Sequence, residues 1–153
     1  MNIFDILGPV MVGPSSSHTA GAVRIGYITR NLLQDTPQLA EIYFHGSFAA
    51  TGIGHGTDRA VVAGLLGMKP DDIRIPDSFH YAEKEGFNYN FHQTDLRGAH
   101  PNTILIEVEG KHGRTLSVQA ASLGGGRIII NKLDGIDVNF TAQKPTLIVH
   151  NLD

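Results

Sequence analysis

One run of polar residues, from Ser15 to Thr19, combines serine and threonine hydroxyls with the imidazole of His18 directly after a Gly-Pro pair. Gly-Pro interrupts regular backbone, and serine or threonine is a favoured N-cap, so a helix is predicted to begin here. The free amides and the macrodipole at a helix N-terminus favour a bound anion such as a carboxylate. The run therefore suits an amino-acid ligand, although one capping serine within a surface loop explains it equally well.

A second polar run, from Gly54 to Asp58, places a histidine between two glycines just before another predicted helix. His55 and Asp58 are three residues apart, so the carboxylate can face the imidazole, orient it and raise its basicity. Glycine on both sides of His55 permits close approach of a ligand to the backbone. Taken alone, the pattern slightly favours a capping Asp58 beside an exposed histidine. A second histidine at a helix entrance shifts the balance towards a functional site.

Two further segments give weaker signals. The segment His100-Pro101-Asn102-Thr103 leads into a predicted strand, where Asn102 or Thr103 can bond a ligand, although turn chemistry explains it equally well. The glycine loop from Ser122 to Arg127 can cradle a carboxylate or phosphate through backbone amides, but a β-bulge is the commoner meaning of such a loop. The remaining histidines show no metal-ligand spacing, so no metal site is expected in this chain.

The composition narrows the class of protein. The 153 residues are 41% hydrophobic and 18% charged, which suits one compact domain with an adequate core. A formal charge of −3 without a Lys/Arg-rich run argues against nucleic-acid binding. Because no apolar stretch approaches the length of a membrane span and no secretion signal is recognised, a cytoplasmic location without membrane association is expected. The absence of cysteine excludes disulfides, thiolate zinc sites and iron–sulfur ligation by cysteines of this chain.

Hydrophobic periodicity and breaker residues predict the elements that must position these motifs. Helices are expected over residues 17–34, 59–68 and 78–86, the second with Thr57 or Asp58 as its N-cap. Strands are expected over residues 41–45, 72–75, 88–93, 104–109, 115–120, 127–131 and 136–140, with the last four in an antiparallel meander. This order predicts an α+β domain, with helices packed on one face of a mostly antiparallel sheet. Residues 145–153 are predicted to form a further lone strand.

The motifs, taken in their order, resemble the β chain of bacterial iron–sulfur L-serine dehydratases. The resemblance runs through about residues 1–140 and rests on Phe4–Pro9, Gly13–Thr19, Gly54–Asp58, His100–Thr103 and Gly124–Gly126. It implies a fold similar to the allosteric substrate-binding domain of some phosphoglycerate dehydrogenases. It also implies a serine dehydratase β domain over residues 1–143, with residues 144–153 as the first strand of a truncated ACT domain.

In that family a separate α part carries the cysteines of a [4Fe–4S] cluster with one open iron position, and L-serine is converted to pyruvate and ammonia. The resemblance thus implies a partner α chain, L-serine as substrate and a cluster held by the partner; homodimerisation stays open. The open iron would polarise the serine hydroxyl while a base removes the Cα proton. His18 and His55 are the expected acid–base or orienting pair, with Asp58 steering His55. The expected substrate-binding residues are Ser15, Ser16, Ser17, Thr19, Asn102 and Thr103.

Two other functions stay open at the level of sequence. The domain can be a purely regulatory serine-binding module that leaves all chemistry to its partner. A pyridoxal-phosphate serine dehydratase would use residues 122–127 as a phosphate cradle and a lysine for the Schiff base, but no lysine lies in a motif. Turnover of His18 and His55 variants at saturating serine distinguishes a regulatory module from a catalytic part, and absorbance of a bound cofactor tests for pyridoxal phosphate.

Overall fold

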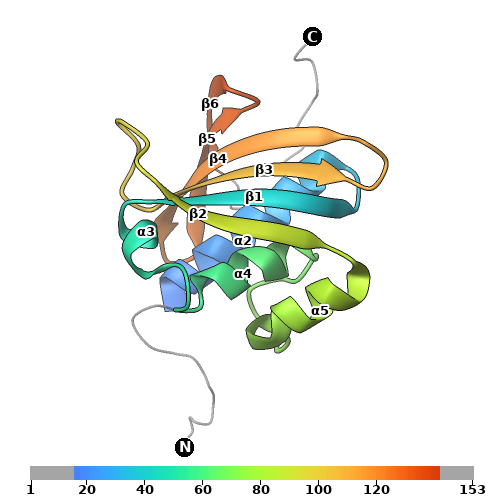
Figure 1. The fold of residues 1–153 in the computed structure, drawn as a ribbon. Helices are drawn as coiled ribbons and strands as arrows, with labels where there is room; N and C mark the ends of the chain where they lie inside the picture. The colour runs from blue at the N-terminus through green and yellow to red at the C-terminus, as the bar shows by residue number, and fades with distance from the viewer. Residues whose placement is uncertain (1–15, 142–153) are drawn as a thin grey trace, which may run out of the picture.

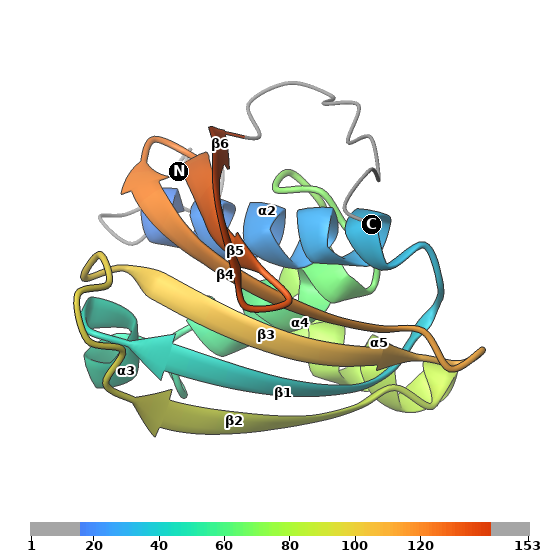
Figure 2. The same ribbon diagram turned by 90° about the horizontal axis from the view of Figure 1, so that it is seen from above.

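The chain forms two layers, a sheet and a group of helices, in a computed structural model that describes residues 16–141. Within that range four α-helices and one short 3₁₀ helix accompany a six-stranded sheet of order β2-β1-β3-β4-β5-β6. Figures 1 and 2 show α2, α4 and α5 on the same face of the sheet, and no helix of the described range covers the other face. The predicted α+β architecture is confirmed.

The strands fall into one parallel pair and a meander. They are β1 (Pro37–His45), β2 (Asn88–Thr94), β3 (Thr103–Gly110), β4 (Thr115–Gly124), β5 (Arg127–Leu133) and β6 (Ile136–Thr141). Strand β1 is parallel to β2 and antiparallel to β3, and each later strand is antiparallel to the one before it. The β1–β2 pair therefore needs a crossover, which the helices after β1 provide. The predicted antiparallel meander is confirmed.

The helices are α2 (Ser16–Leu33), α3 (Ser47–Thr51), α4 (Thr57–Leu65) and α5 (Ser78–Glu85). Helices α2 and α4 cross where Gly26 meets Gly64, and a Cβ added to Gly64 would lie 2.9 Å from the Cα of Gly26 and overlap the carbonyl of Val23. The two backbones pack directly because neither glycine has a side chain. This crossing fixes the start of α2 relative to the start of α4.

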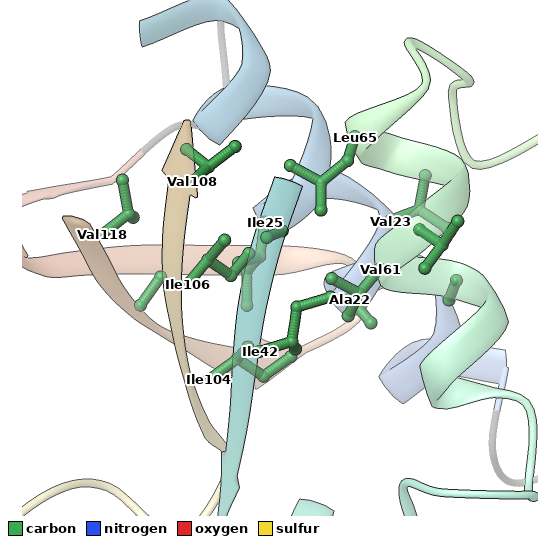
Figure 3. Packing of buried hydrophobic residues seen from close by; sticks show 14 of the residues in the cluster. Ala22, Val23, Ile25, Ile42, Val61, Leu65, Ile104, Ile106, Val108 and Val118 are labelled. Carbon is green, nitrogen blue, oxygen red and sulfur yellow. The ribbon is translucent and has the colours of Figure 1, made fainter. Parts of the chain in front are cut away.

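The core lies between these two helices and the inner face of the sheet. Alternate residues of β1 and β3, among them Ile42 and Ile106, point towards the helices and are fully buried. They meet Ile25 of α2 and the face of α4 that carries Val61 and Leu65 (Figure 3). Each such side chain contributes roughly 1.5–3 kcal/mol of burial free energy. The packing therefore determines which side of α2 faces the sheet.

One predicted strand, over residues 72–75, is wrong. The segment forms turns and enters a 3₁₀ helix, η1 (Ile75–Asp77). The Asp72 carboxylate accepts hydrogen bonds from the backbone N–H and the guanidinium of Arg74, at 2.7–2.9 Å. These bonds close a local turn, and a proline follows at position 76, so an extended conformation is not adopted.

The N-cap expected for the second helix is also wrong. Gly56, with a φ of 99°, occupies the N-cap, and Thr57 and Asp58 are the first helical residues. The helix ends at Leu65, where 68 was expected, and strand β1 begins at Pro37, where 41 was expected. Helix α3 was not predicted at all. The strand expected over residues 145–153, and with it the ACT boundary, lies outside the described residues.

Candidate functional site

The motifs singled out in the sequence come together at one end of the molecule. Because β1 and β4 both run antiparallel to β3, the end of β1, the start of β3 and the end of β4 lie at the same end of the sheet. Helices α2 and α4 begin at this end as well (Figure 1). We call this region, made of residues 16–19, 52–58, 100–103 and 122–127, the site end.

The first motif forms the opening of helix α2. Its first turn contains Ser16, Ser17 and His18, for which the structure describes the backbone; Ser15 lies outside the described residues. Thr19 is half-buried. The predicted helix start is confirmed, so its free amides can attract an anion at this position. The roles assigned to these side chains stay predictions.

The second motif is held by the carboxylate of Asp58. This residue is 4% exposed, and its Oδ2 accepts a hydrogen bond from the N–H of Gly54 at 2.8 Å. Its Oδ1 accepts the N–H of Arg59 at 2.7 Å and lies 3.9 Å from the Arg59 guanidinium. Among the described residues no hydrogen bond joins Asp58 to His55, so the expected direct bond is not formed and the carboxylate binds backbone amides instead. Asp58 instead fixes the backbone of the loop that carries His55.

His55 lies on the surface of this loop, between two glycines with positive φ, 84° at Gly54 and 99° at Gly56. Nothing within 4 Å would meet a Cβ at either glycine, so the loop is open on both sides of the histidine. Its neighbour Ile53 is 42% exposed, which is unusual for a large apolar side chain. An exposed imidazole on a tethered loop is available to a ligand or to a partner chain.

Aromatic side chains support the same loop from the helix side. The Arg59 guanidinium lies 4.7 Å from the centre of the Phe79 ring, which in turn stacks on Tyr89. Burial raises the pKa of Tyr89, and the negative charge of Asp58 adds to that increase. The phenol therefore stays protonated at neutral pH. These contacts connect the start of α4 to strand β2 and keep Asp58 in place.

The third motif forms a tight turn before β3. The N–H of Asn102 donates to Nδ1 of His100 at 3.0 Å, and the buried hydroxyl of Thr103 donates to the carbonyl of His100 at 2.7 Å. Thr103 thus stabilises the turn, and its role in substrate binding stays a prediction. Like His55, His100 is exposed at the site end, and the sequence interpretation did not select it. Its position in the same motif as Asn102 was the signal that could have identified it.

The glycine loop joins β4 to β5. The ladder shifts register between Ser122 and Gly124, so the β-bulge interpretation is confirmed. The guanidinium of Arg127 donates to the carbonyls of Gly124 and Leu123 at 3.4 and 3.5 Å. The cation is therefore turned to its own loop, which gives the phosphate-cradle alternative no support. Gly126 lies against α2, where an added Cβ would be 3.8 Å from that of Ala20.

Buried polar groups distinguish this end further. Among the described residues, the buried side-chain atoms without a hydrogen-bond partner are Oδ1 of Asn102 and Oγ of Ser122.

Over the same part of the chain, no three histidine, cysteine, aspartate or glutamate side chains are grouped to hold a metal ion. No helix among residues 16–141 combines the length and apolar character that a membrane crossing requires.

Comparison with known proteins identifies the family. Residues 2–85 match the model of the serine dehydratase beta chain. The chain is 44% identical over 151 residues to a probable L-serine dehydratase beta chain of Bacillus subtilis, covering 98% of this chain and 68% of the relative. It is 43% identical over 147 residues to the L-serine dehydratase beta chain of Peptoniphilus asaccharolyticus, covering 95% of this chain and 66% of the relative.

The chain also matches part of a longer protein over a shorter segment. L-serine dehydratase 2 of Escherichia coli is 41% identical over 81 residues, which is 49% of this chain and 17% of that protein. The chain spans about two thirds of the length of the two beta chains it matches. Since the family model covers more than half of the chain and the beta chains match nearly all of it, the chain belongs to the serine dehydratase beta chain family.

Proposed function

We propose that this chain is the β part of an L-serine dehydratase, which converts L-serine to pyruvate and ammonia together with an α chain. The observation that supports this most is the convergence of three histidine-bearing motifs, far apart in sequence, at the site end. The family adds support, because the beta chains that match nearly all of this chain are named as parts of L-serine dehydratases.

The groups of this chain suit binding and proton transfer. The start of α2 offers free amides to the carboxylate of the substrate, where negative charge grows as the Cα proton leaves. His55, or His18 on the first turn of α2, takes that proton. Loss of the proton and of hydroxide, which leaves as water, gives aminoacrylate, and its hydrolysis gives pyruvate and ammonia. Asp58 holds the His55 loop through the amide of Gly54 and thereby sets the position of the base.

The iron–sulfur cluster does not fit this chain. The sequence contains no cysteine, and residues 16–141 contain no group of side chains suited to a metal ion. We therefore assign the [4Fe–4S] cluster to the α chain. The exposed His55 loop, which also carries the exposed Ile53, lies at the site end, where a partner can cover it and exclude water. A cytoplasmic location and homodimerisation stay predictions.

Reconstitution tests the proposal. The chain, extended to the length of its family relatives, is mixed anaerobically with the cysteine-bearing α chain, and pyruvate is followed after addition of L-serine. We expect pyruvate only when both chains are present. Full activity of the α chain alone would contradict a catalytic role. In that case serine binding by this chain, measured by calorimetry, would favour the regulatory module.

A further inference from the structure

The two unpaired buried oxygens of the site end have no role in the chemistry derived so far. Ser122 is 0% exposed, and its Oγ contacts no donor or acceptor; Asn102 is half-buried, with its Oδ1 turned inward. Buried polar atoms without a partner are costly and therefore rare in folded proteins, so a pair of them in one place needs a reason.

These two residues are neighbours on adjacent strands. Thr103 of β3 is paired with Ala121 of β4, so the next residues along the two strands, Asn102 and Ser122, lie opposite each other. The N–H of Ser122 donates to the carbonyl of Asn102 at 2.9 Å. Side chains alternate along a strand, so both point to the helix side of the sheet, as the next inward residues, Ile104 and Ala120, do. Opposed residues have Cβ atoms roughly 4.5–5.5 Å apart. That separation suits one small donor placed between two oxygen acceptors.

Helix α2 lies directly against this pair at Gly21, with no side chain of its own in between. Gly21 lies against Ser122, and a Cβ at Gly21 would overlap the serine hydroxyl. The glycine sits a little more than one turn after the start of the helix, where free amides favour a carboxylate. The structure thus places two unpaired acceptors close to a site for an anion. An α-amino acid presents the complementary groups, an ammonium beside a carboxylate.

We propose that Asn102 and Ser122 accept hydrogen bonds from the α-ammonium group of the substrate while the start of α2 binds its carboxylate. The inference rests on the proposed function and adds Ser122 to the residues that touch substrate. An ammonium carries three N–H donors and no acceptor, so it matches a pair of unpaired oxygens. The partial exposure of Asn102 provides the side from which the ammonium enters.

The test uses Ser122→Ala in the assembled enzyme, with Ser117→Ala as the matched control. Ser117 lies on the same strand and belongs to the opposite face, by the alternation of β4. Steady-state turnover of L-serine is measured together with inhibition by 3-hydroxypropanoate, which is serine without its ammonium group. In Ser122→Ala we expect a roughly 10- to 100-fold higher KM for L-serine, the scale of a hydrogen bond to a charged group. The inhibition constant of 3-hydroxypropanoate and the melting temperature stay as in the control.

Other outcomes overturn the assignment. An unchanged KM means that a water molecule alone occupies the pair, and an equal rise in KM and in the inhibition constant means that Ser122 supports the carboxylate. A lower melting temperature would indicate a structural role for the hydroxyl. In that case the KM for L-serine and the inhibition constant of 3-hydroxypropanoate are measured for Asn102→Ala, and they decide whether the pair binds the ammonium group. If the wild-type chain supports no turnover, the proposed function fails. Calorimetry on the chain itself, which compares the binding of L-serine with that of 3-hydroxypropanoate, then tests the ammonium site independently of turnover.

Discussion

The two ends of helix α2 differ in how completely their polar groups are paired. At its C-terminal end, the Asp35 side chain is 3% exposed and accepts hydrogen bonds from the N–H groups of His112 and Thr36, at 2.8 and 2.7 Å. The His112 ring nitrogen Nδ1 lies 2.8 Å from the same carboxylate. The Arg30 guanidinium donates to the carbonyl of Leu65 at 2.9 Å. We call this region, residues 30–36 and 110–114, the clamp end.

At the site end the same helix begins among unpaired groups. Oδ1 of Asn102 and Oγ of Ser122 are buried without partners, and glycines with positive φ flank the exposed His55. Pairing every polar group makes a region stable, while groups kept for a ligand lower stability in the free protein. The comparison suggests that the clamp end holds the fold and that the site end keeps its hydrogen-bonding capacity for binding.

The largest effect should come from the exposed histidine of the site end. His55→Asn in the assembled enzyme should lower kcat by roughly 100-fold or more, the scale of general acid–base catalysis. The melting temperature should stay unchanged, because the side chain is exposed and has no partner among the described residues. His18→Asn should lower kcat similarly. His80→Asn, an exposed histidine on α5, is the control; near-wild-type turnover of both the His55 and His18 variants would contradict the proposed roles.

The next largest effect should appear where the two helices cross. Gly64→Ala places a Cβ onto the carbonyl of Val23 and should cost about 1–3 kcal/mol of unfolding free energy through overpacking. Gly86→Ala is the control, because Gly86 has open space around it and a φ of 72°, so its cost is conformational and about 1–2 kcal/mol. Urea denaturation gives both values. Only Gly64→Ala should also raise the KM for serine, since it shifts the start of α2 relative to α4.

A smaller effect compares two buried serines. The hydroxyl of Ser78 donates to the carbonyl of Arg59 at 2.7 Å, whereas that of Ser122 has no partner. Ser78→Ala should therefore lower the unfolding free energy by about 1 kcal/mol, the usual net value of a hydrogen bond. Ser122→Ala should leave it unchanged or raise it slightly. Equal destabilisation of the two variants, measured by urea denaturation, would remove the distinction between paired and unpaired regions.

The smallest effect concerns acid stability at the clamp end. Hydrogen bonding from the His112 side chain lowers the pKa of Asp35, and the backbone N–H groups of His112 and Thr36 add to this. A lowered folded-state pKa stabilises the protein above the unfolded value of about 3.9, and this stabilisation is lost as pH falls through the folded-state pKa. The His112 ring is 84% exposed, so solvent screens the pair and the effect is modest.

This stabilisation disappears when the carboxylate is removed. Between pH 7 and pH 3, the melting temperature of the wild-type chain should fall by more than that of Asp35→Asn. Asp137→Asn serves as the control, because Asp137 is 88% exposed and lies 3.7 Å from Lys132. If the melting temperatures of Asp35→Asn and Asp137→Asn fall by the same amount between pH 7 and pH 3, the Asp35 pair contributes nothing specific to acid stability.

Much of the architecture could be predicted because local signals agree with the tertiary structure. The alternating strands predicted the meander, and the turn between β5 and β6 is made by Asp134 and Gly135, both with positive φ. The error at residues 72–75 arose because an aspartate bonded to a nearby backbone amide competes with extended structure, which apolar content alone does not reveal. Helix α3 was missed because its five residues are too few to show a helical period.

The candidate site was predictable as a set of motifs and not as a geometry. Spacing suggested that Asp58 faces His55, but the carboxylate turns back to the amide of Gly54, a choice that depends on the conformation of the loop. Ser122 was seen only as part of a glycine loop. Its lack of a partner depends on Gly21 and Asn102, about 100 and 20 residues away in sequence, and no local pattern predicts such an encounter.

The glycine crossing of α2 and α4 has a consequence for motion. Two helices in direct backbone contact, with Gly64 seated against Val23 and Gly26, cannot slide or rotate past one another without overlap. The two helix entrances should therefore move as one rigid body. Any adjustment to a bound molecule would then fall to the loops with positive-φ glycines, at residues 52–56 and 124–126. In NMR relaxation-dispersion spectra, exchange on the microsecond to millisecond timescale should appear in those loops and be absent from helices α2 and α4.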